Sequence, residues 1–563
     1  MAPDLQDPFL VKRLGRRLPG PAAGKIEEFL GDIERQRTTL DGLAAQADAN
    51  RPTLTSFDRW GERVDDVVLH ASYHSLGDLA YGRFGLVNMA YDPAARQEWE
   101  GYPRSVAMAG GMTFAMSEQG LFCPLCMTDG AALVLTRALE SVRSDSPATA
   151  RWRTYIARLT SRGADRWSGA MFLTERQGGS DVGANTCTAV EDGGVWRLHG
   201  EKWFCSNAGA DLALVLARPA GAPDGTRGLA LFAMPRTLDD GTRNPYVIRR
   251  LKDKLGTRSM ATGEVELNGA AAYLIGGADR GFAQMAEMIN LSRLYNAVGS
   301  VAILARAYTE SAAWAADRNA FGRRIADFPL VRDTLVQMAA ETDGAQALVW
   351  EIVGRMDRAA EGREGETDRR LIRILTPLAK LYTAKRAVWA ASEAIEILGG
   401  NGYVEEFITS RLLRDAQVLP IWEGTTNIQT LDVFRALGKE AGEEVLFSLL
   451  RQCLDAAPRE GQPIASRLRE HVDELESALA GLRGHEDDAW TVGGRQWAFK
   501  LAPAACASIL VGESAVAEGP DRSELLAHAE KLVDMHLEGW TAIGLLRALD
   551  RRRAKVHVVP AST

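Results

Sequence analysis

The 563-residue sequence has few cysteines, no long apolar run and no excess of positive charge. Six cysteines in so long a chain argue against a disulfide framework and for a reducing compartment, so we expect a cytoplasmic protein. A net charge of −8 argues against a surface that coats nucleic acid throughout, although it allows a local basic patch. No run of about 18 apolar residues occurs, so no transmembrane helix and no membrane partner are predicted.

Other familiar patterns are missing or incomplete. No G-x-G-x-x-G stands between a predicted strand and a predicted helix, which argues against a Rossmann dinucleotide fold. Cys123 and Cys126 form a C-x-x-C without a second pair or a nearby histidine. This favours buried packing over a redox or metal role, and we predict no metal site. The first residues, with Asp4 and Asp7 ahead of Lys12, resemble neither a signal peptide nor a transit peptide.

The chain is too long for a single core, so several domains are expected. Residues 1–168 are predicted to be mainly helical, and residues 169–278 change to the period of two that is typical of strands. Six short strands separated by turn residues predict a compact β domain, most simply a barrel. These strands are 187–190, 195–199, 212–217, 229–233, 247–251 and 263–267. From 279 to 440 the helical period returns, with helices expected near 281–318, 328–360, 369–398 and 425–437, and residues 441–563 form a further, mainly helical segment.

The stretch around which the chain is organised runs from Met171 to Thr186. An apolar run ends at a turn that carries Thr174, Gly178, Gly179, Ser180 and Asp181. Paired glycines followed by Ser-Asp allow backbone N–H groups to approach an anion closely. On its own, such a turn is more often only a connection between strands.

Four further motifs follow this turn in the chain: Lys202-Trp203-Phe204-Cys205-Ser206-Asn207, Arg318 with Phe321-Gly322, Leu398-Gly399-Gly400-Asn401-Gly402-Tyr403, and Ile421-Trp422-Glu423-Gly424-Thr425. In this order they resemble the flavin-binding and catalytic motifs of the acyl-CoA dehydrogenase family. The spellings KWFCS, LKDKLGTRS and IWEGTTN, together with the long C-terminal segment, resemble more specifically the AidB branch, which is linked to the adaptive response to alkylation.

The resemblance implies an α+β but mainly α fold. Its parts would be an N-terminal helical domain (1–168), a middle β-barrel (169–278), a four-helix-bundle domain (279–440) and a C-terminal helical extension (441–563). It also implies FAD as cofactor and a homotetramer in which Arg318 and Phe321 reach the flavin of a neighbouring subunit. The residues that match the family's cofactor contacts are Met171, Thr174, Gly179, Ser180, Phe204, Ser206, Arg318, Phe321, Gly399, Gly400, Thr425 and Asn427.

Glu423 is the predicted catalytic base. It follows the apolar run 419–422 and precedes Gly424, and a carboxylate in apolar surroundings is a stronger base. Removing a proton α to a thioester carbonyl needs such a base, and by resemblance Glu423 matches the family's catalytic glutamate. The simpler interpretation is a glutamate that caps the next helix. Some members of the family place the base on the helix that begins near 281, but Ser292 stands at that position, and an unaided serine cannot act as a base at neutral pH.

Two functions remain open from the sequence. The first is an FAD-dependent acyl-CoA dehydrogenase, an oxidoreductase that acts on an acyl-CoA or another small molecule. The second is an AidB-like flavoprotein that protects DNA or destroys alkylating agents, with weak dehydrogenase activity. Arg293 matches an arginine near the substrate, and Trp422, where most of the family's dehydrogenases have tyrosine, would narrow the acyl channel. A third relative, nitroalkane oxidase, uses aspartate as its base, which Glu423 argues against.

DNA binding is expected to be weak at most. Residues 441–563 hold 14 Lys and Arg against 19 Asp and Glu, a net charge of −5. Only Arg551, Arg552 and Arg553 with Lys555 form a dense basic run, which is enough for a small patch but not for a whole DNA-binding face.

Overall fold

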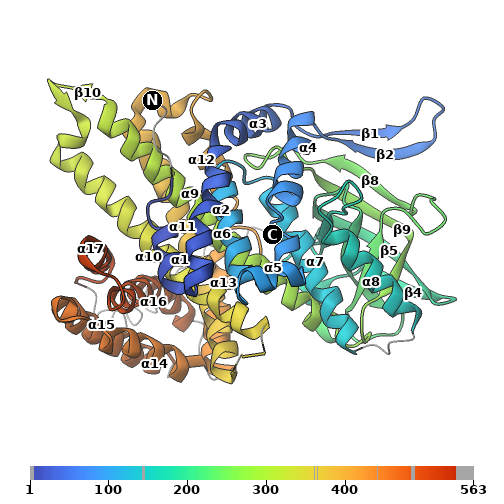
Figure 1. Ribbon diagram of the computed structural model, residues 1–563. Coiled ribbons are helices and arrows are strands. Elements are labelled where there is room, and N and C mark those ends of the chain that lie inside the picture. The colour runs from blue at the N-terminus through green and yellow to red at the C-terminus, as the bar shows by residue number, and fades with distance from the viewer. Residues whose placement is uncertain are drawn as a thin grey trace, which may run out of the picture. The chain divides into compact units, whose positions relative to one another are not determined.

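The structure, a computed structural model, describes residues 6–141, 146–360, 362–363, 365–440, 442–483 and 489–539 (Figure 1). The chain divides into two compact units. One runs from Gly24 to Ala302 and is called the N-terminal unit here. The other, the C-terminal unit, joins the chain before Gly24 to the chain from Ile303 onward. The basic run 551–555 lies outside the described residues.

The first part of the N-terminal unit is mainly helical, as predicted, but it also contains a β-hairpin that the sequence analysis missed. Strand β1 (Thr53–Phe57) pairs with β2 (Arg63–Val68) across a turn in which Asp58 accepts hydrogen bonds from the N–H groups of Trp60 and Glu62. The helices of this region and the one at its boundary are α2 (Gly20–Arg35), α3 (Arg37–Ala49), α4 (Ala71–Gly77), α5 (Pro93–Glu98), α6 (Pro103–Ala115), α7 (Phe122–Ser141) and α8 (Pro147–Leu159).

Helix α7 is the one described helix whose length and composition would suit a membrane span. The window Phe122–Glu140 has a mean hydropathy of 1.3, but 72% of it is buried inside the structure. Its side chains, with those of α8, pack on the β domain, which includes Leu212 and Leu214. The apolar composition of α7 is therefore used in a protein core, and the C-x-x-C at its start contributes to the packing because Cys126 is buried.

All six predicted strands are present, and five of them close into the barrel of the N-terminal unit. The six are β4 (Thr188–Asp192), β5 (Val195–Ser206), β6 (Leu212–Pro219), β7 (Ala230–Pro235), β8 (Tyr246–Leu251) and β9 (Thr262–Leu274), preceded by β3 (Gly169–Phe172). Strand β6 pairs with β4, β4 with β5, β5 with β9, β9 with β7 and β7 again with β6, so the ladder closes on itself. Strand β3 adds to β6 in parallel, and β8 adds to β9.

Strand β6 is buried on both faces, and its alternation separates two cores. Ala213, Val215 and Ala217 face the barrel interior with Phe232 and Ile248. The alternate residues Leu212, Leu214 and Leu216 face the cluster that contains α7 and α8. Because successive strand residues point to opposite faces, an unbroken apolar strand is what a sheet covered on both sides requires.

The C-terminal unit is built from helices at the predicted positions. Helix α9 (Gly281–Asp317) begins in the N-terminal unit and continues into this one, where α10 (Pro329–Ala360), α11 (Glu366–Leu398), α12 (Ile408–Ala416) and α13 (Thr426–Lys439) follow it. Helix α1 (Leu10–Arg17), from the start of the chain, belongs to the same unit. The extension contains α14 (Gly442–Asp455), α15 (Gln462–Arg483), α16 (Ala489–Ser514) and α17 (Gly519–His536). The mainly α fold class is thus confirmed, whereas the four-domain division stays a prediction.

Helices α16 and α17 pack directly on α10. A Cβ at Gly344 of α10 would lie 2.6 Å from the Cδ1 atom of Leu532 and 3.1 Å from the Cβ atom of Cys506. A glycine is therefore needed at this contact between the extension and α10. The extension accordingly belongs to the same core as the helices that precede it.

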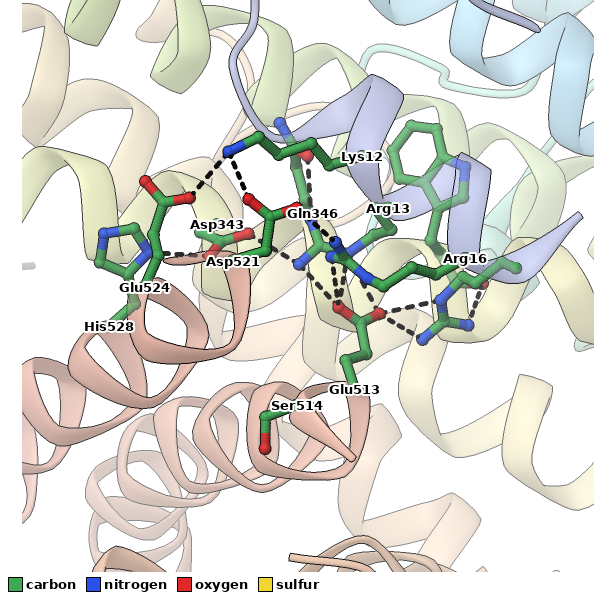
Figure 2. Close-up of polar contacts among 12 residues, drawn as sticks. Lys12, Arg13, Arg16, Asp343, Gln346, Glu513, Ser514, Asp521, Glu524 and His528 are labelled. Carbon is green, nitrogen blue, oxygen red and sulfur yellow. Dashed lines mark hydrogen bonds and ion pairs between the residues drawn. The ribbon is translucent and has the colours of Figure 1, made fainter. Parts of the chain in front are cut away.

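A buried ionic cluster joins α1 to the extension (Figure 2). The guanidinium of Arg13 is fully buried and lies 2.7 Å from Asp343 of α10 and 3.0 Å from Glu513 of α16. Asp343 also meets the ring of His528 of α17 at 2.8 Å. Burial alone would raise the pKa of Asp343 and of Glu513, but the positive charge of Arg13 brings both pKa values below the ordinary range. Each buried charge therefore has a partner of opposite sign.

Candidate functional site

The Gly-rich turn of the N-terminal unit is organised by a buried ion pair. Lys202, on β5, lies with its Nζ 2.8 Å from Oε1 of Glu175, and both side chains are buried. Glu175 also accepts hydrogen bonds from the N–H groups of Thr186 at 2.6 Å and Cys187 at 3.2 Å, which closes the turn. Burial alone would raise the pKa of Glu175, but the charge of Lys202 and these hydrogen bonds lower it to about 2.

The glycines of this turn place its backbone against Thr174. Gly178 has φ +130°, and a Cβ at Gly179 would lie 2.5 Å from Oγ1 of Thr174, so a side chain at Gly179 would collide with that hydroxyl. Gly179 and Ser180 are exposed. Among the described residues, no group accepts a hydrogen bond from the backbone N–H of Gly179 or of Ser180. Exposed, free N–H groups on a glycine turn are able to receive an anionic group such as a pyrophosphate.

Phe204 and Ser206 lie on β5 next to this turn. The N–H of Trp203 donates to the carbonyl oxygen of Thr174 at 2.8 Å, which holds β5 beside the end of β3. The register with β9 shifts between Lys202 and Cys205, so one extra residue bulges there. Bulges redirect side chains, and Phe204 is 56% exposed although its strand neighbours Lys202 and Cys205 are buried. Met171 and Ser206 are half-buried on the neighbouring strands.

A cationic side chain borders the two aromatic rings of β5. The Nζ of Lys252 lies 3.6 Å from the ring centre of Trp203 and 4.8 Å from that of Phe204. The Nζ of Lys252 also lies 2.6 Å from Oε1 of Glu264, whose negative charge balances that of the lysine. The exposed face of Phe204 and the polar turn beside it together fit a flat aromatic ligand that carries a phosphate tail, as FAD does.

Arg293 and Ser292 stand on α9. Arg293 is half-buried and donates to Oδ1 of Asn290 at 3.1 Å. Ser292 is buried, and its hydroxyl accepts from the thiol of Cys126 at 3.3 Å. Ser292 thus contacts a neutral thiol, and no contact within the described part of the chain activates it as a base.

Glu423 lies in the C-terminal unit, in the turn between α12 and α13. The N–H of Trp422 donates to the carbonyl oxygen of Val418 at 3.0 Å, and α13 begins just after Thr425. Glu423 has φ +58°, in the left-handed region that side chains other than glycine rarely adopt, and Gly424 follows with φ +103°. Trp422 and Glu423 are both half-buried. The raised pKa that the sequence suggests for Glu423 stays a prediction.

The other predicted cofactor residues of this unit lie in two loops. Gly399, with φ +64°, ends α11, and Gly399 and Gly400 are both exposed. Thr425 and Asn427 are exposed at the start of α13. Asn427 already has a partner, because its Oδ1 accepts from Nη1 of Arg495 at 2.5 Å. The extension, through α16, therefore reaches a residue that the sequence predicts to contact the cofactor.

Arg318 and Phe321 lie in a small hairpin after α9. Strand β10 (Asn319–Ala320) pairs with β11 (Arg323–Arg324), and the two turn residues, Phe321 and Gly322, have φ of +51° and +83°. A two-residue turn with both φ values positive is the type that suits a hairpin, although phenylalanine is a strained choice for it. Phe321 is 97% exposed, and Arg318 is exposed as well. Both side chains are free to meet another molecule.

Within each unit, the structure brings together some of the predicted residues. In the N-terminal unit, the Gly-rich turn with Thr174, Gly179 and the exposed Ser180 lies beside strand residues that were predicted with it, namely Met171, Phe204 and Ser206. In the C-terminal unit, Trp422, Glu423, Thr425 and Asn427 share one turn and the helix after it. No role was predicted from the sequence for the charged residues that hold these turns in place. They are Glu175 with Lys202 in the first turn, and Lys380 of α11, whose Nζ donates to the carbonyl oxygen of Gly424 in the second. The charges of Glu175 and Lys202 inside the motifs were an available signal, whereas Lys380 is one of many charged residues on α11.

In the C-terminal unit, a half-buried carboxylate on the turn at Glu423 is able to accept a proton. In the N-terminal unit, an exposed aromatic wall beside an anion-receiving turn is able to hold a flavin nucleotide.

Comparison with known proteins gives the family. Three family models match: the AidB N-terminal domain over residues 6–157, the acyl-CoA dehydrogenase middle domain over 170–270 and the acyl-CoA dehydrogenase C-terminal domain over 279–438. The chain is 34% identical to acyl-CoA dehydrogenase family member 11 of Caenorhabditis elegans, over 85% of this chain and 77% of that protein. It is 38% identical to the putative acyl-CoA dehydrogenase AidB of Escherichia coli, over 76% of this chain and 77% of that one.

The fold comparison agrees. The structure of C. elegans ACDH-11 in complex with C11-CoA matches with a TM-score of 0.87 and 31% identity, covering 99% of this chain and 95% of that one. Since relatives above 30% identity cover more than two thirds of both chains, the chain belongs to the acyl-CoA dehydrogenase family and carries the N-terminal domain of its AidB branch.

Proposed function

We propose that the protein is an FAD-dependent acyl-CoA dehydrogenase in which Glu423 is the catalytic base. The observation that supports it most directly is the conformation of Glu423, a half-buried carboxylate held on a left-handed turn. Strained backbone of this kind persists only where surrounding structure holds it, and it gathers at active sites.

In the proposed reaction, the carboxylate of Glu423 takes the proton from the carbon α to the thioester. The Cα–H electron pair becomes the Cα=Cβ bond as hydrogen leaves the β carbon as hydride. FAD, when bound, supplies the hydride acceptor. The backbone N–H of Glu423 would help to hold the thioester oxygen, on which negative charge develops. Arg293 would lie toward the substrate and Trp422 would border the acyl chain.

The residues assigned to FAD are those around Thr174 and Phe204 in the N-terminal unit and those of the loops at Gly399 and Thr425 in the C-terminal unit. The turn at Ser180 would receive the pyrophosphate through its free N–H groups, and Phe204 would cover one face of the flavin ring. The proposed compartment is the cytoplasm, because all six cysteines are free.

The test is an anaerobic titration of the purified protein with acyl-CoAs of different chain length, following the flavin absorbance. Bleaching by at least one acyl-CoA supports the proposal. Flavin released by acid should chromatograph as FAD, at about one per chain. Recovery of FMN or of no flavin would refute the cofactor assignment.

A second candidate function is protection against alkylating agents with little thioester turnover. It is favoured by the match of residues 6–157 to the AidB N-terminal domain and by Trp422 beside the base. A flavin that no acyl-CoA bleaches would favour this function over dehydrogenation.

We also propose a homotetramer in which the exposed hairpin at Arg318 reaches a flavin of a neighbouring subunit. Arg318→Ala should then weaken FAD retention and self-association together, each by about 10- to 100-fold, the usual worth of a charged hydrogen bond. Sedimentation velocity and flavin content measured over a dilution series check this. The matched control is Arg324→Ala on the opposite strand of the same hairpin. If the unmutated protein sediments as a monomer with a full complement of FAD, a flavin site shared between subunits is contradicted.

A further inference from the structure

The backbone around Glu423 does not hold its conformation by local preference. Glu423 has φ +58°, and the left-handed region costs a residue with a Cβ about 1–2 kcal/mol. Gly424, at φ +103°, continues the unusual path. Contacts from elsewhere in the chain must therefore stabilise this turn.

Two buried side chains make those contacts. The amide nitrogen Nε2 of Gln429, on α13, donates to the carbonyl oxygen of Glu423 at 2.7 Å and lies 3.4 Å from that of Gly424. The Nζ of Lys380, on α11, donates to the carbonyl oxygen of Gly424 at 2.5 Å. Both side chains are fully buried. We call Lys380, Gln429 and these two carbonyl oxygens the carbonyl clamp.

In this position, the amide group of Gln429 has its oxygen, Oε1, buried and left without a hydrogen-bond partner among the described residues. Exchanging its oxygen and nitrogen would bring Oε1 against two carbonyl oxygens, so those acceptors fix the orientation. A buried acceptor without a partner costs about 1–3 kcal/mol. A buried polar atom without a partner is rare in native structures and needs an explanation. Here the explanation is the hydrogen bond that Nε2 of the same amide donates to the carbonyl oxygen of Glu423.

Gly424 leaves the space that the clamp needs. A Cβ there would lie 2.8 Å from Nε2 of Gln429 and 3.0 Å from Cγ2 of Ile428. Any side chain at Gly424 would therefore push Gln429 away from the carbonyl of Glu423. The glycine, the left-handed glutamate and the two buried donors form one arrangement.

We propose that Gln429 and Lys380 are positioning residues, which hold the backbone of Glu423 in its left-handed conformation and so aim its carboxylate at the substrate's α-proton. The proposal rests on the proposed function, because it assigns a role in that reaction. Neither side chain takes the proton. If the clamp is removed, Glu423 relaxes toward negative φ, and its Cα–Cβ bond swings away from the orientation seen here. Misplacing a catalytic group by about 1 Å can cost about 100-fold in rate.

The test compares Gln429→Leu with Thr430→Val in the full-length flavoprotein. Gln429→Leu removes the donor and keeps an apolar side chain of similar size. Thr430→Val is the matched control, because Thr430 is equally buried on α13 but donates only to the helix carbonyl of Thr426, at 3.0 Å. Two quantities are measured: hydrogen exchange in peptides that cover 421–425, and the stopped-flow rate of flavin reduction by acyl-CoA with and without deuterium at Cα.

Gln429→Leu should speed exchange in 421–425 and slow flavin reduction by about 10- to 100-fold, with a larger α-deuterium isotope effect. Its FAD content should stay within about twofold of the parent. The reduction rates are compared at saturating acyl-CoA, so that weaker binding through the N–H of Glu423 does not enter the comparison. Thr430→Val should leave both quantities unchanged. Gly424→Ala displaces Gln429 and also strains a backbone at φ +103°, so it should produce both changes at least as strongly.

Reduction of Gln429→Leu at the parent's rate would overturn the positioning role, whether or not exchange rises. Unchanged exchange would overturn the clamp itself. Failure of the proposed function shows elsewhere, in the parent protein, as flavin that no acyl-CoA bleaches. The two failures are therefore distinguishable.

Discussion

Glu423→Gln should lower acyl-CoA-driven flavin reduction by a factor on the order of 10²–10⁴, the usual worth of a positioned general base. Glutamine keeps the size and hydrogen-bonding capacity of the side chain but cannot accept the α-proton. Flavin content should hardly change, because the residues assigned to the cofactor are left intact. Stopped-flow reduction under anaerobic conditions measures the effect.

The control for this prediction is Glu406→Gln, the same chemical change on an exposed carboxylate between α11 and α12. It should reduce at the parent's rate. If Glu423→Gln also reduces at that rate, the proposed base is wrong. Trp422→Tyr is the companion variant: if the indole narrows the acyl channel, this change should raise the rate with longer acyl chains.

Lys202→Met should destabilise the N-terminal unit by about 3–5 kcal/mol, since it leaves the buried carboxylate of Glu175 without its cation. It should also weaken a pH dependence. In the parent, the pKa of Glu175 is lowered from its ordinary value of 4.5 to about 2. Its contribution to stability is therefore complete above about pH 4.5 and lost only as the pH falls toward 2.

In Lys202→Met, burial still raises the pKa of Glu175 and the hydrogen bonds from Thr186 and Cys187 still lower it, but the charge of Lys202 is gone. The pKa of Glu175 should then rise from about 2, so the variant should lose less stability than the parent as the pH falls from about 5 to about 3. Thermal unfolding at both pH values checks the difference. Arg176→Met is the control, because the exposed Arg176 of the same turn pairs with Glu201 of β5 at the surface, and such pairs contribute about 1 kcal/mol or less. An equal loss of stability in both variants would contradict the role given to the buried pair.

The parts of the fold that follow simple periodicity could be predicted from the sequence. The six predicted strands show either alternating polar and apolar residues or a continuous apolar run. Each is bounded by turn residues and lies where this pattern predicts it. The hairpin of β1 and β2 was missed because its strands are only half-buried, so their alternation is faint beside the helices around them.

The site divides in the same way. The spacing of glycines and hydroxyl residues predicted the turns at Thr174, Gly179 and Glu423, because the conformation of a turn depends on residues that are adjacent in the sequence. The grip of Lys380 on Gly424 could not be predicted, since these residues are 44 positions apart and meet only when α11 and α13 pack. The same holds for Arg495 and Asn427, 68 positions apart. Such contacts depend on tertiary structure, which no local pattern specifies.

The ionic cluster at Arg13 has a consequence for synthesis on the ribosome. Arg13 emerges early, yet its partners Asp343 and Glu513 follow 330 and 500 residues later. Helix α1 therefore cannot complete its ion pairs until α16 has left the exit tunnel, and the guanidinium of Arg13 lacks its Glu513 partner until then. The N-terminal unit, whose contacts lie between Gly24 and Ala302, is free to fold in the meantime. Closing so long a loop comes late and slowly, so the C-terminal unit matures only after translation has passed Glu513.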